Sequence, residues 1–440
     1  MNKKTILLIL FFLSFLVRIL LVNDGLYHHD SVRAAIATER TVEDLRLHPS
    51  VHGRYGYTLI NALFYAIPYE LFNAKSAEAT ITFVSILFGS LTVVVLYLLI
   101  KQLFNPYVAL WSSLIFSFNP VYLSVTTYAS THGMSLFFVL ASFYLLVRYL
   151  KDGKDPLLVI FFYLFSLTVR SDNIIYLPVF VILFLYPHLL GYFKYKHHNW
   201  FGAILLLLSV IPLVLSPAAN TNEIDFALKP VLISITYLFM ALTIPLSIMV
   251  LLSLAFSDKK TIILYLWFAF SFIPFIFVSV ISYRFLLSAI IPLIVLFVYN
   301  ISEKFKRVTT ILSILLIIFM FVSIFPVLAF RNEYSSGKEL GLFANILEDD
   351  SYIIIGDEAV FINYYSDVNT IVFSESSIPK IDKLLDTNNV YFLYCGNHKR
   401  LEFITSYFMI EHRFDLRLED YHHSELDLKI RDCVVYEVVK

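Results

Sequence analysis

The residues best suited to chemistry are grouped in Tyr27-His28-His29-Asp30, directly after an apolar run that extends from Thr5 to Val22. A carboxylate at the membrane surface, such as that of Asp30, can accept a proton from a hydroxyl nucleophile. His28 and His29 could orient this carboxylate or join it as metal ligands, although neighbouring residues need not face the same way. An ionisable group at the end of a membrane helix is by default a functional candidate. The alternative is an ordinary hydrated loop.

Two arginines also lie at the ends of apolar runs. Arg170 occurs in Val169-Arg170-Ser171-Asp172, and Arg284 occurs in Ser282-Tyr283-Arg284-Phe285 with almost no loop around it. An arginine this close to hydrocarbon is costly unless it snorkels or meets an anion, and guanidinium groups bind phosphate bidentately. We therefore predict that both arginines bind a lipid phosphate. The alternative is a local pair of Arg170 with Asp172 and a snorkelling Arg284.

Other polar residues near these positions are assigned supporting roles. A lone histidine at the start of a helix, such as His132 after Ser130-Thr131, is more often a cap or packing residue than a ligand. The supporting set is His28, His29, Arg54, His132, Asp172 and Tyr283.

The composition indicates a membrane protein. The chain has 440 residues, of which 59% are hydrophobic and 15% charged, and its net charge is -1. Soluble domains are about half apolar and a quarter charged, and the mean hydropathy here is +0.75. The basic residues are scattered between apolar runs, which argues against a nucleic-acid partner and leaves the lipid bilayer as the expected environment.

Apolar runs long enough to cross a bilayer predict about eleven transmembrane helices. They fall at 5–22, 80–100, 107–124, 132–149, 157–169, 173–190, 200–217, 231–254, 261–282, 285–300 and 308–328. If the N-terminus is cytoplasmic, every short cytoplasmic loop is basic, as the positive-inside rule requires. These loops contain Lys101, Arg148, Lys151, Lys154, Lys194, Lys196, Lys259, Lys260, Lys304, Lys306 and Arg307. The same orientation places Asp30, Arg170 and Arg284 at the outer surface of a cell membrane.

Two parts of the chain are not membrane spans. The outer loop 23–79 is predicted to be polar, with one helix at Tyr57 to Phe72 that lies in the outer membrane interface or, alternatively, forms a re-entrant segment. From residue 331 the composition changes, and short strands alternate with helical segments, so 331–440 is predicted to be an external α/β domain. The expected strands are Tyr352–Ile355, Thr370–Phe373, Val390–Tyr394 and Cys433–Val438, with helices at Asp382–Leu385 and Leu401–Phe408.

The chain has two cysteines, Cys395 and Cys433, and no pair spacing typical of a metal site. They form a disulfide if the C-terminal domain faces an oxidising compartment, or remain two buried thiols.

Four short stretches occur in order along residues 1–300. They are Tyr27-His28-His29-Asp30; Leu98 to Phe104 with its apolar continuation to Asn119-Pro120; Thr168 to Asp172 leading to Leu177-Pro178; and Tyr283 to Leu287 followed by Pro292. In these stretches the chain resembles the GT-C glycosyltransferases. These are multi-span enzymes that use polyprenyl-phosphate sugars, such as protein O-mannosyltransferases and lipid A aminoarabinose transferases. The expected fold is an α-helical polytopic membrane domain of GT-C type at 1–330, with the small α/β domain after it.

The resemblance implies the transfer of a sugar from a polyprenyl-phosphate donor to a lipid, glycan or protein acceptor, with inversion at the anomeric carbon. Asp30 would be the general base on the acceptor hydroxyl, and Arg170 and Arg284 would stabilise the departing lipid phosphate. The competing class is a multi-span transporter or a lipid-binding membrane protein without chemistry. Transporters usually place polar residues at the midplane of the membrane, whereas here they collect at one surface.

The first stretch departs from many relatives in a way that bears on cofactors. Many relatives have two adjacent acidic residues there and another in the second outer loop. Here Ser31 follows Asp30, and Tyr128 to His132 contains no acid. No cofactor is therefore assigned with certainty, and a divalent metal held by His29 and Asp30 stays as the open alternative. The absence of Trp from 331–440 argues against the oligosaccharyltransferase branch.

Overall fold

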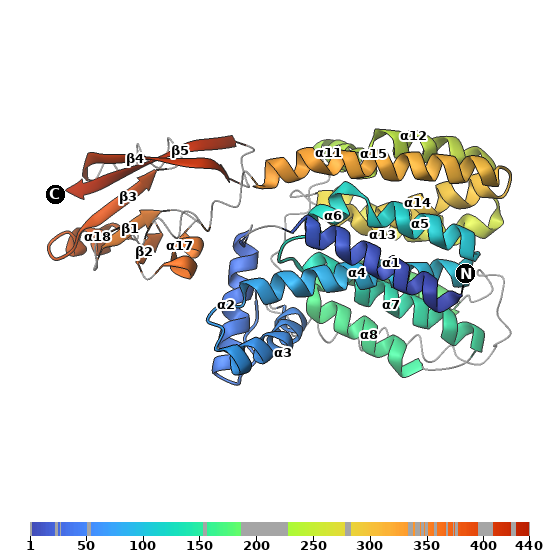
Figure 1. Ribbon diagram of the computed structural model, residues 1–440, viewed down its shortest axis with the longest axis horizontal. Helices are drawn as coiled ribbons and strands as arrows, with labels where there is room; N and C mark the ends of the chain where they lie inside the picture. Colours follow the sequence, from blue (N-terminus) through green and yellow to red (C-terminus); the bar gives the residue numbers. More distant parts are fainter. Residues whose placement is uncertain are drawn as a thin grey trace.

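The computed structural model describes residues 2–22, 25–26, 28–50, 54–152, 156–185, 228–277 and 283–332, and the shorter segments 338, 344, 347, 351–355, 359–366, 368–372, 374, 377–394, 408–423 and 428–439. It consists of a bundle of apolar helices and a small sheet at one end of the bundle (Figure 1). The α-helices of the bundle and its flanks are α1 (Lys3–Leu20), α2 (His29–Glu43), α3 (Tyr55–Phe72), α4 (Glu78–Leu103), α5 (Pro106–Ser117), α6 (Pro120–Thr126), α7 (Thr131–Asp152), α8 (Pro156–Val169), α9 (Leu177–Leu185), α11 (Leu228–Leu242), α12 (Ile244–Ser253), α13 (Ile262–Phe272), α14 (Leu287–Ser302) and α15 (Lys306–Asn332). Short 3-10 helices are η2 (Ser171–Tyr176), η4 (Leu254–Phe256), η5 (Lys259–Thr261), η6 (Ile273–Phe277) and η7 (Tyr283–Leu286).

The two ends of the bundle differ. The N-terminus of α1 lies at one end, whereas α2 lies across the opposite end, and the C-terminal sheet is beyond α2 on that same side (Figure 1). This arrangement is what an N-terminus and a C-terminal region on opposite membrane faces would require. Which face is cytoplasmic stays a prediction.

Two Asn-Pro pairs explain where the fifth and sixth helices begin. The side chain of Asn105 accepts hydrogen bonds from the backbone N–H groups of Tyr107 and Val108, at 3.0 and 2.9 Å. Asn119 caps α6 in the same way through Tyr122 N, at 3.1 Å. In both helices proline follows the cap, where its missing N–H has no helical partner in any case. The second pair divides the predicted span 107–124 into two helices bent by 63°.

The predicted spans coincide with helices wherever the chain is described, and 200–217 lies outside the described residues. Several of them are interrupted. Helices α4, α7, α15 and the segment 284–302 are each long and apolar enough to cross a membrane, and the described residues give up to six spans if each bent pair is one. The second bent pair is α11 and α12, which meet at 99° around Thr243, whose φ of +69° is unusual for a β-branched residue.

Helix α14 is the centre of the bundle. Its residues from Leu287 to Asn300 are all buried, and it contacts α5, α12, α13 and α15. In contrast, α1 and α15 expose large apolar side chains such as Phe12, Leu20 and Val322. Apolar surface on that scale marks a face that contacts lipid.

The prediction for 23–79 was wrong in one respect. The polar segment after Asp30 is not a loop, because residues His29–Glu43 form α2. His28 caps this helix, and Val32 and Ala35, three residues apart, are both buried on one face. The predicted interfacial segment is helical, as α3, and begins at Tyr55.

The C-terminal sheet has five strands in the order β2-β1-β3-β5-β4. Strand β1 (Tyr352–Ile355) pairs in parallel with β2 (Asn369–Val372) and β3 (Val390–Tyr394), while β5 (Leu428–Val439) is antiparallel to β3 and to β4 (Met409–His423). Helices α17 (Ala359–Tyr365) and α18 (Ile378–Leu384) complete this region. The predicted strands are present, and the predicted helix at 382–385 overlaps α18. Residues 401–407 and Cys395 lie outside the described residues.

Candidate active site

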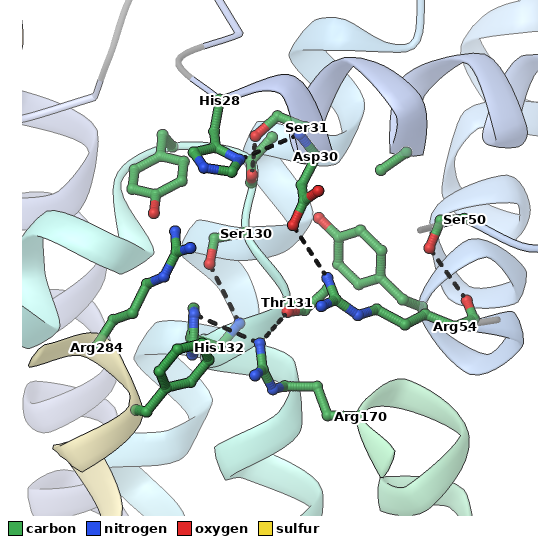
Figure 2. Close-up of a pocket in the computed structure, with 15 residues that line it drawn as sticks. His28, Asp30, Ser31, Ser50, Arg54, Ser130, Thr131, His132, Arg170 and Arg284 are labelled. Atoms are coloured by element: carbon green, nitrogen blue, oxygen red, sulfur yellow. Dashed lines mark hydrogen bonds and ion pairs between the residues drawn. The ribbon is translucent and has the colours of Figure 1, made fainter. Parts of the chain in front are cut away.

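A polar pocket opens at the end of the bundle that α2 crosses (Figure 2). It encloses about 600 Å³ of empty space, its open mouth included. Its walls come from α2, the start of α3, the connection between α6 and α7, the start of η2, and η7. The lining residues are His28, Asp30, Ser31, Ala34, Ser50, Arg54, Tyr57, Tyr128, Ala129, Ser130, Thr131, His132, Arg170, Arg284 and Phe285.

Asp30 is in the first turn of α2. The Nδ1 atom of His28 accepts a hydrogen bond from the backbone N–H of Asp30 at 3.1 Å, so the imidazole caps the helix. This leaves the Asp30 carboxylate in the pocket, where its Oδ2 is 3.6 Å from Nη1 of Arg54. The Asp30 side chain keeps 26% of its surface exposed, so a substrate can reach it.

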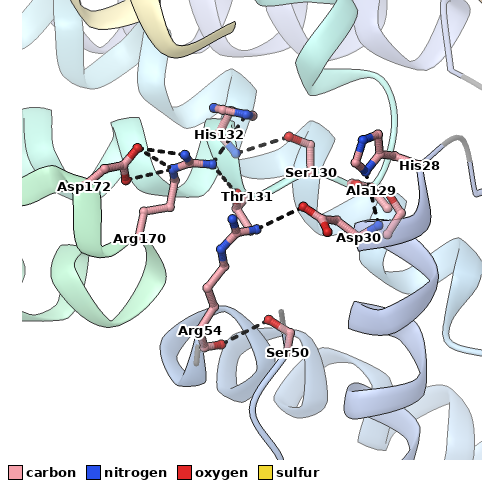
Figure 3. A network of polar contacts seen from close by, with 11 residues as sticks. His28, Asp30, Ser50, Arg54, Ala129, Ser130, Thr131, His132, Arg170 and Asp172 are labelled. Carbon is pink, nitrogen blue, oxygen red and sulfur yellow. Dashed lines mark hydrogen bonds and ion pairs between the residues drawn. The ribbon is translucent and has the colours of Figure 1, made fainter. Parts of the chain in front are cut away.

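Arg54 immediately precedes α3 and points into the same pocket (Figure 3). Burial and, to a smaller extent, the charge of Arg170 lower the pKa of Arg54, Asp30 acts in the opposite direction, and the resulting pKa is about 10. Arg54 is therefore still a cation at neutral pH, although it lies close to other positive charges.

Arg170 occupies the break between α8 and η2, and Asp172 holds it firmly. Its Nε donates to Oδ1 of Asp172 at 3.0 Å, and its Nη2 donates to Oδ2 at 2.7 Å. Its Nη1 donates to Oγ1 of Thr131 at 3.0 Å and lies 3.5 Å from Nε2 of His132. Most of the donors of Arg170 are thus already in use, and the local pair that the sequence left open is present (Figure 3).

Arg284 is in a different situation. It lies in η7, just before the buried helix α14, and its side chain points into the pocket (Figure 2). Its Nε is buried and has no hydrogen-bond partner among the described residues. The guanidinium groups of Arg284 and Arg170 lie 5.6 and 5.3 Å from the centre of the Phe285 ring. An unpaired buried N–H is costly, so this donor is ready for an anionic ligand.

His132 is buried at the start of α7, with its ring 5.9 Å from that of Phe285. Its backbone N–H donates to Oγ of Ser130 at 3.2 Å. These contacts fit a packing residue that also forms part of the pocket wall.

The structure brings together most of the residues singled out from the sequence. His28, Asp30, Arg54, His132, Arg170 and Arg284 line the pocket, and Asp172 lies behind Arg170. The side chains of His29 and Tyr283 lie outside the described part of the structure. The roles assigned to all of these residues stay predictions.

Sequence reasoning missed two residues, Phe285 in the pocket wall and Arg18 in the interior of the bundle. The guanidinium groups of Arg170 and Arg284 both lie near the ring of Phe285. Arg18 in α1 is fully buried, donates to Oγ1 of Thr126 at 2.9 Å and lies 4.8 Å from the ring centre of Tyr122. The signal for Arg18 was available, because an arginine inside an apolar run is itself unusual.

The described residues suit an anion better than a divalent metal. No three His, Cys, Asp or Glu side chains converge among them. The two carboxylates near the pocket, Asp30 and Asp172, each face a guanidinium group. The side chain of His29 lies outside the described residues, so the metal site suggested for His29 and Asp30 stays a prediction.

A second, smaller pocket adjoins the first and shares His132, Arg170, Arg284 and Phe285 with it. It has about 380 Å³ of empty space. Its further walls include Leu136, Ile175, Phe275 and Leu287. Ser135, Asp172, Asn173, Tyr176 and Ser288 line it as well, so the space around Arg284 continues into a second pocket of mixed polar and apolar lining.

Comparisons with known proteins agree with this architecture. Residues 58–216 match the family model described as dolichyl-phosphate-mannose-protein mannosyltransferase. ArnT from Cupriavidus metallidurans, bound to undecaprenyl phosphate, aligns with a TM-score of 0.57 and 10% identity over 98% of this chain and 97% of that one. The Archaeoglobus fulgidus oligosaccharyltransferase in the apo form aligns with a TM-score of 0.61 and 11% identity over 98% and 75% of the two chains. The chain has the GT-C glycosyltransferase fold.

The archaeal enzyme AglB, in complex with an inhibitory peptide and a dolichol-phosphate, also has this GT-C fold, with a TM-score of 0.59 and 11% identity over 98% of this chain and 76% of that one. No curated protein gives a significant sequence match. The predicted membrane fold class, the resemblance to GT-C enzymes and the predicted glycosyltransferase class are confirmed at the level of the superfamily.

Proposed function

We propose that this GT-C protein transfers a sugar from a polyprenyl-phosphate donor to an acceptor hydroxyl at the outer face of the membrane, with inversion. The acceptor is a lipid, a glycan or a protein. The observation that carries the proposal is the pair of groups in one pocket, the accessible carboxylate of Asp30 and the buried Nε of Arg284, which has no partner among the described residues. One supplies a base and the other a phosphate ligand.

The reaction is a single displacement. Asp30 takes the proton of the acceptor hydroxyl while the oxygen of that hydroxyl forms a bond to the anomeric carbon of the sugar. The bond between that carbon and the phosphate oxygen breaks, and polyprenyl phosphate leaves with one more negative charge. Arg284 stabilises this charge as it develops, and Arg170, held by Asp172, contributes its field and its remaining donor capacity.

Charge and polarity in the pocket suit such a donor. Arg54, Arg170 and Arg284 face the carboxylates of Asp30 and Asp172, which leaves one positive charge in excess when the imidazoles are neutral. A sugar phosphodiester carries one negative charge. The adjoining pocket combines polar residues with apolar ones such as Phe275 and Leu287.

Asp30→Asn tests the proposal because it keeps the size of the side chain and removes the base. Transfer of labelled sugar from undecaprenyl-phosphate or dolichyl-phosphate mannose to acceptors in membrane vesicles should fall about 10²-fold or more. Glu70→Gln, an exposed carboxylate on α3, is the matched control and should keep the wild-type rate. Wild-type turnover by Asp30→Asn would remove Asp30 from the mechanism. If the wild-type protein bound no donor, the alternative of a transporter or non-catalytic membrane protein would be favoured.

We place the N-terminus in the cytoplasm and the sheet region, within the predicted domain 331–440, outside the plasma membrane. The support is the basic short loops and the position of the sheet at the end of the bundle opposite the N-terminus (Figure 1). The test is maleimide labelling of Lys383→Cys, an exposed position on α18, after both native cysteines are replaced by serine. Labelling only after the membrane is permeabilised would reverse the orientation.

We also propose that α3 rests in the outer membrane interface. Tyr55, Leu59, Leu63, Ile67 and Leu71 recur every four residues and are all exposed, so they form one apolar stripe along the helix. Replacing Leu63 with tryptophan would report on this contact, because bilayer lipids carrying a quencher should reduce its fluorescence.

A further inference from the structure

Helix α17 of the C-terminal region lies against α2, the helix that carries Asp30 (Figure 1). Its last two residues are adjacent tyrosines whose hydroxyls reach different parts of the Asp30 segment. The hydroxyl of Tyr365 accepts a hydrogen bond from the backbone N–H of Leu26 at 3.0 Å. The hydroxyl of Tyr364 donates to Oε1 of Glu39 at 2.8 Å. The two contacts therefore lie on either side of Asp30 in the chain.

The contact at Glu39 joins three elements. The same Oε1 atom accepts a hydrogen bond from the backbone N–H of Ala77, at 2.7 Å, just before α4 begins. The hydroxyls of Tyr364 and Ser76 are 2.8 Å apart. One carboxylate oxygen of α2 is thus shared between α17 and the start of a bundle helix, and displacement of either partner would leave it with one hydrogen bond fewer.

The contact at Leu26 is equally close. Leu26 is buried in an apolar cluster with Val32 and Ala35, and Tyr364 and Tyr365 pack against that cluster. One residue earlier, Gly25 has a φ of +82°, in the left-handed region that favours glycine. A Cβ atom there would lie 3.3 Å from Cβ of Lys338, whose Nζ is 3.4 Å from Oε1 of Glu78.

We propose that Tyr364 and Tyr365 are positioning residues for Asp30, holding the chain before and along α2 so that the carboxylate faces the pocket. A helix fixed at two points along its chain has little freedom to rotate or slide. Asp30 lies in the first turn, between these points. This inference rests on the proposed function, in which Asp30 is the base. It gives the C-terminal region a part in the chemistry without any contact to the substrate.

The test uses Tyr364→Phe and Tyr365→Phe, singly and together, because each change removes one hydroxyl and keeps the ring in the cluster. Tyr352→Phe in the sheet is the matched control. Hydrogen exchange of peptides covering residues 26–43 should quicken in the double variant and stay unchanged in the control. Turnover should fall about tenfold in the double variant with donor affinity within twofold of wild type, as expected when a reacting group is misplaced.

Two further comparisons separate positioning from a general loss of stability. In the Asp30→Asn background the tyrosine changes should cause no additional loss of rate, because groups that act as a unit are non-additive. Glu39→Gln keeps an acceptor oxygen and should retain most turnover, whereas Glu39→Ala should lose it to the same extent as Tyr364→Phe.

The outcomes distinguish this inference from the proposed function. Unchanged exchange in α2 would overturn the positioning role, whatever the activity of Asp30→Asn. An equal fold-loss in the wild-type and Asp30→Asn backgrounds would also overturn it. Wild-type turnover by Asp30→Asn alone would overturn the base assignment, and with it any catalytic meaning of the tyrosine contacts.

Discussion

Oδ2 of Asp30 lies 3.6 Å from Nη1 of Arg54, so the proposed base already faces a cation before any substrate arrives. Asp30 comes from α2, which was not predicted from the sequence, and Arg54 immediately precedes α3, which was predicted. Their pairing links the base to a pocket that also contains Arg170 and Arg284. Arg54 therefore belongs with the residues whose replacement should affect the reaction.

Arg54→Met keeps much of the length of the side chain and removes its charge. The Asp30 carboxylate then loses a partner and the donor phosphate loses part of the positive field. We expect kcat/KM for the donor to fall about tenfold, the scale of one hydrogen bond to a charged group. Arg33→Met is the control, because Arg33 is exposed on α2. Equal effects of the two changes would show that only the overall charge of this surface matters.

Arg284→Lys keeps the positive charge and the ability to snorkel, but lysine lacks the planar fork that binds phosphate bidentately. If Arg284 holds the donor phosphate, donor affinity should weaken by roughly 1–3 kcal/mol. The measurement is donor binding to purified wild-type and variant protein in the same detergent. Arg307→Lys, exposed at the start of α15, is the control. Equal affinities and equal thermal stabilities would reduce Arg284 to an anchor of its helix.

The membrane part of the fold could be predicted from the sequence because a bilayer imposes a simple rule on length and polarity. The breaks within predicted spans were harder to find. The bend at Thr243 and the division at Asn119-Pro120 depend on how neighbouring helices pack, although proline marked the second. Helix α2 was hidden by its polar composition, and its buried positions Val32 and Ala35 were the available signal.

In the site and the sheet, too, some features could be predicted from local sequence and others depend on the tertiary structure. Asp30, Arg170 and Arg284 were identified because charges next to apolar runs are rare. In contrast, Glu39 and Tyr364 are ordinary residues in local sequence, and only the tertiary structure brings them together from positions far apart in the chain. Strand β4 was missed because most of its residues are polar or charged, although charged residues alternate with apolar ones from Phe414 to Leu418, which is typical of a strand.

Gly89→Ala should destabilise the bundle. A Cβ atom at Gly89 would lie 2.8 Å from Cβ of Thr126 and 2.9 Å from Nε of Arg18, closer than real Cβ contacts allow. The Cβ of Thr126 moves only with the backbone of α6, so the clash cannot be relieved by a side-chain rotation. We expect a loss of about 1–3 kcal/mol, as for other overpacked cores, seen as a lower Tm in detergent. An unchanged Tm would mean that α4 and α6 can separate at little cost.

Glu39 gives a prediction for the pH dependence of stability. Burial raises the pKa of this carboxyl above its ordinary value of 4.5, and the hydrogen bonds from Ala77 and Tyr364 offset only part of that effect. Between the ordinary and the raised pKa, the folded protein therefore binds more protons at Glu39 than the unfolded chain does. The contribution of Glu39 to stability consequently falls as pH rises through this window.

Glu39→Gln removes this titration while keeping an acceptor oxygen for Tyr364. The Tm of the variant relative to wild type should accordingly increase as pH rises from about 4.5 through the raised pKa, and then level off. The measurement is thermal unfolding of both proteins in one detergent across this pH range. Glu70→Gln, an exposed carboxylate on α3, serves as the control and should show a flat difference. A flat difference for Glu39→Gln as well would mean that burial at the junction of α2 and α17 does not penalise the charge.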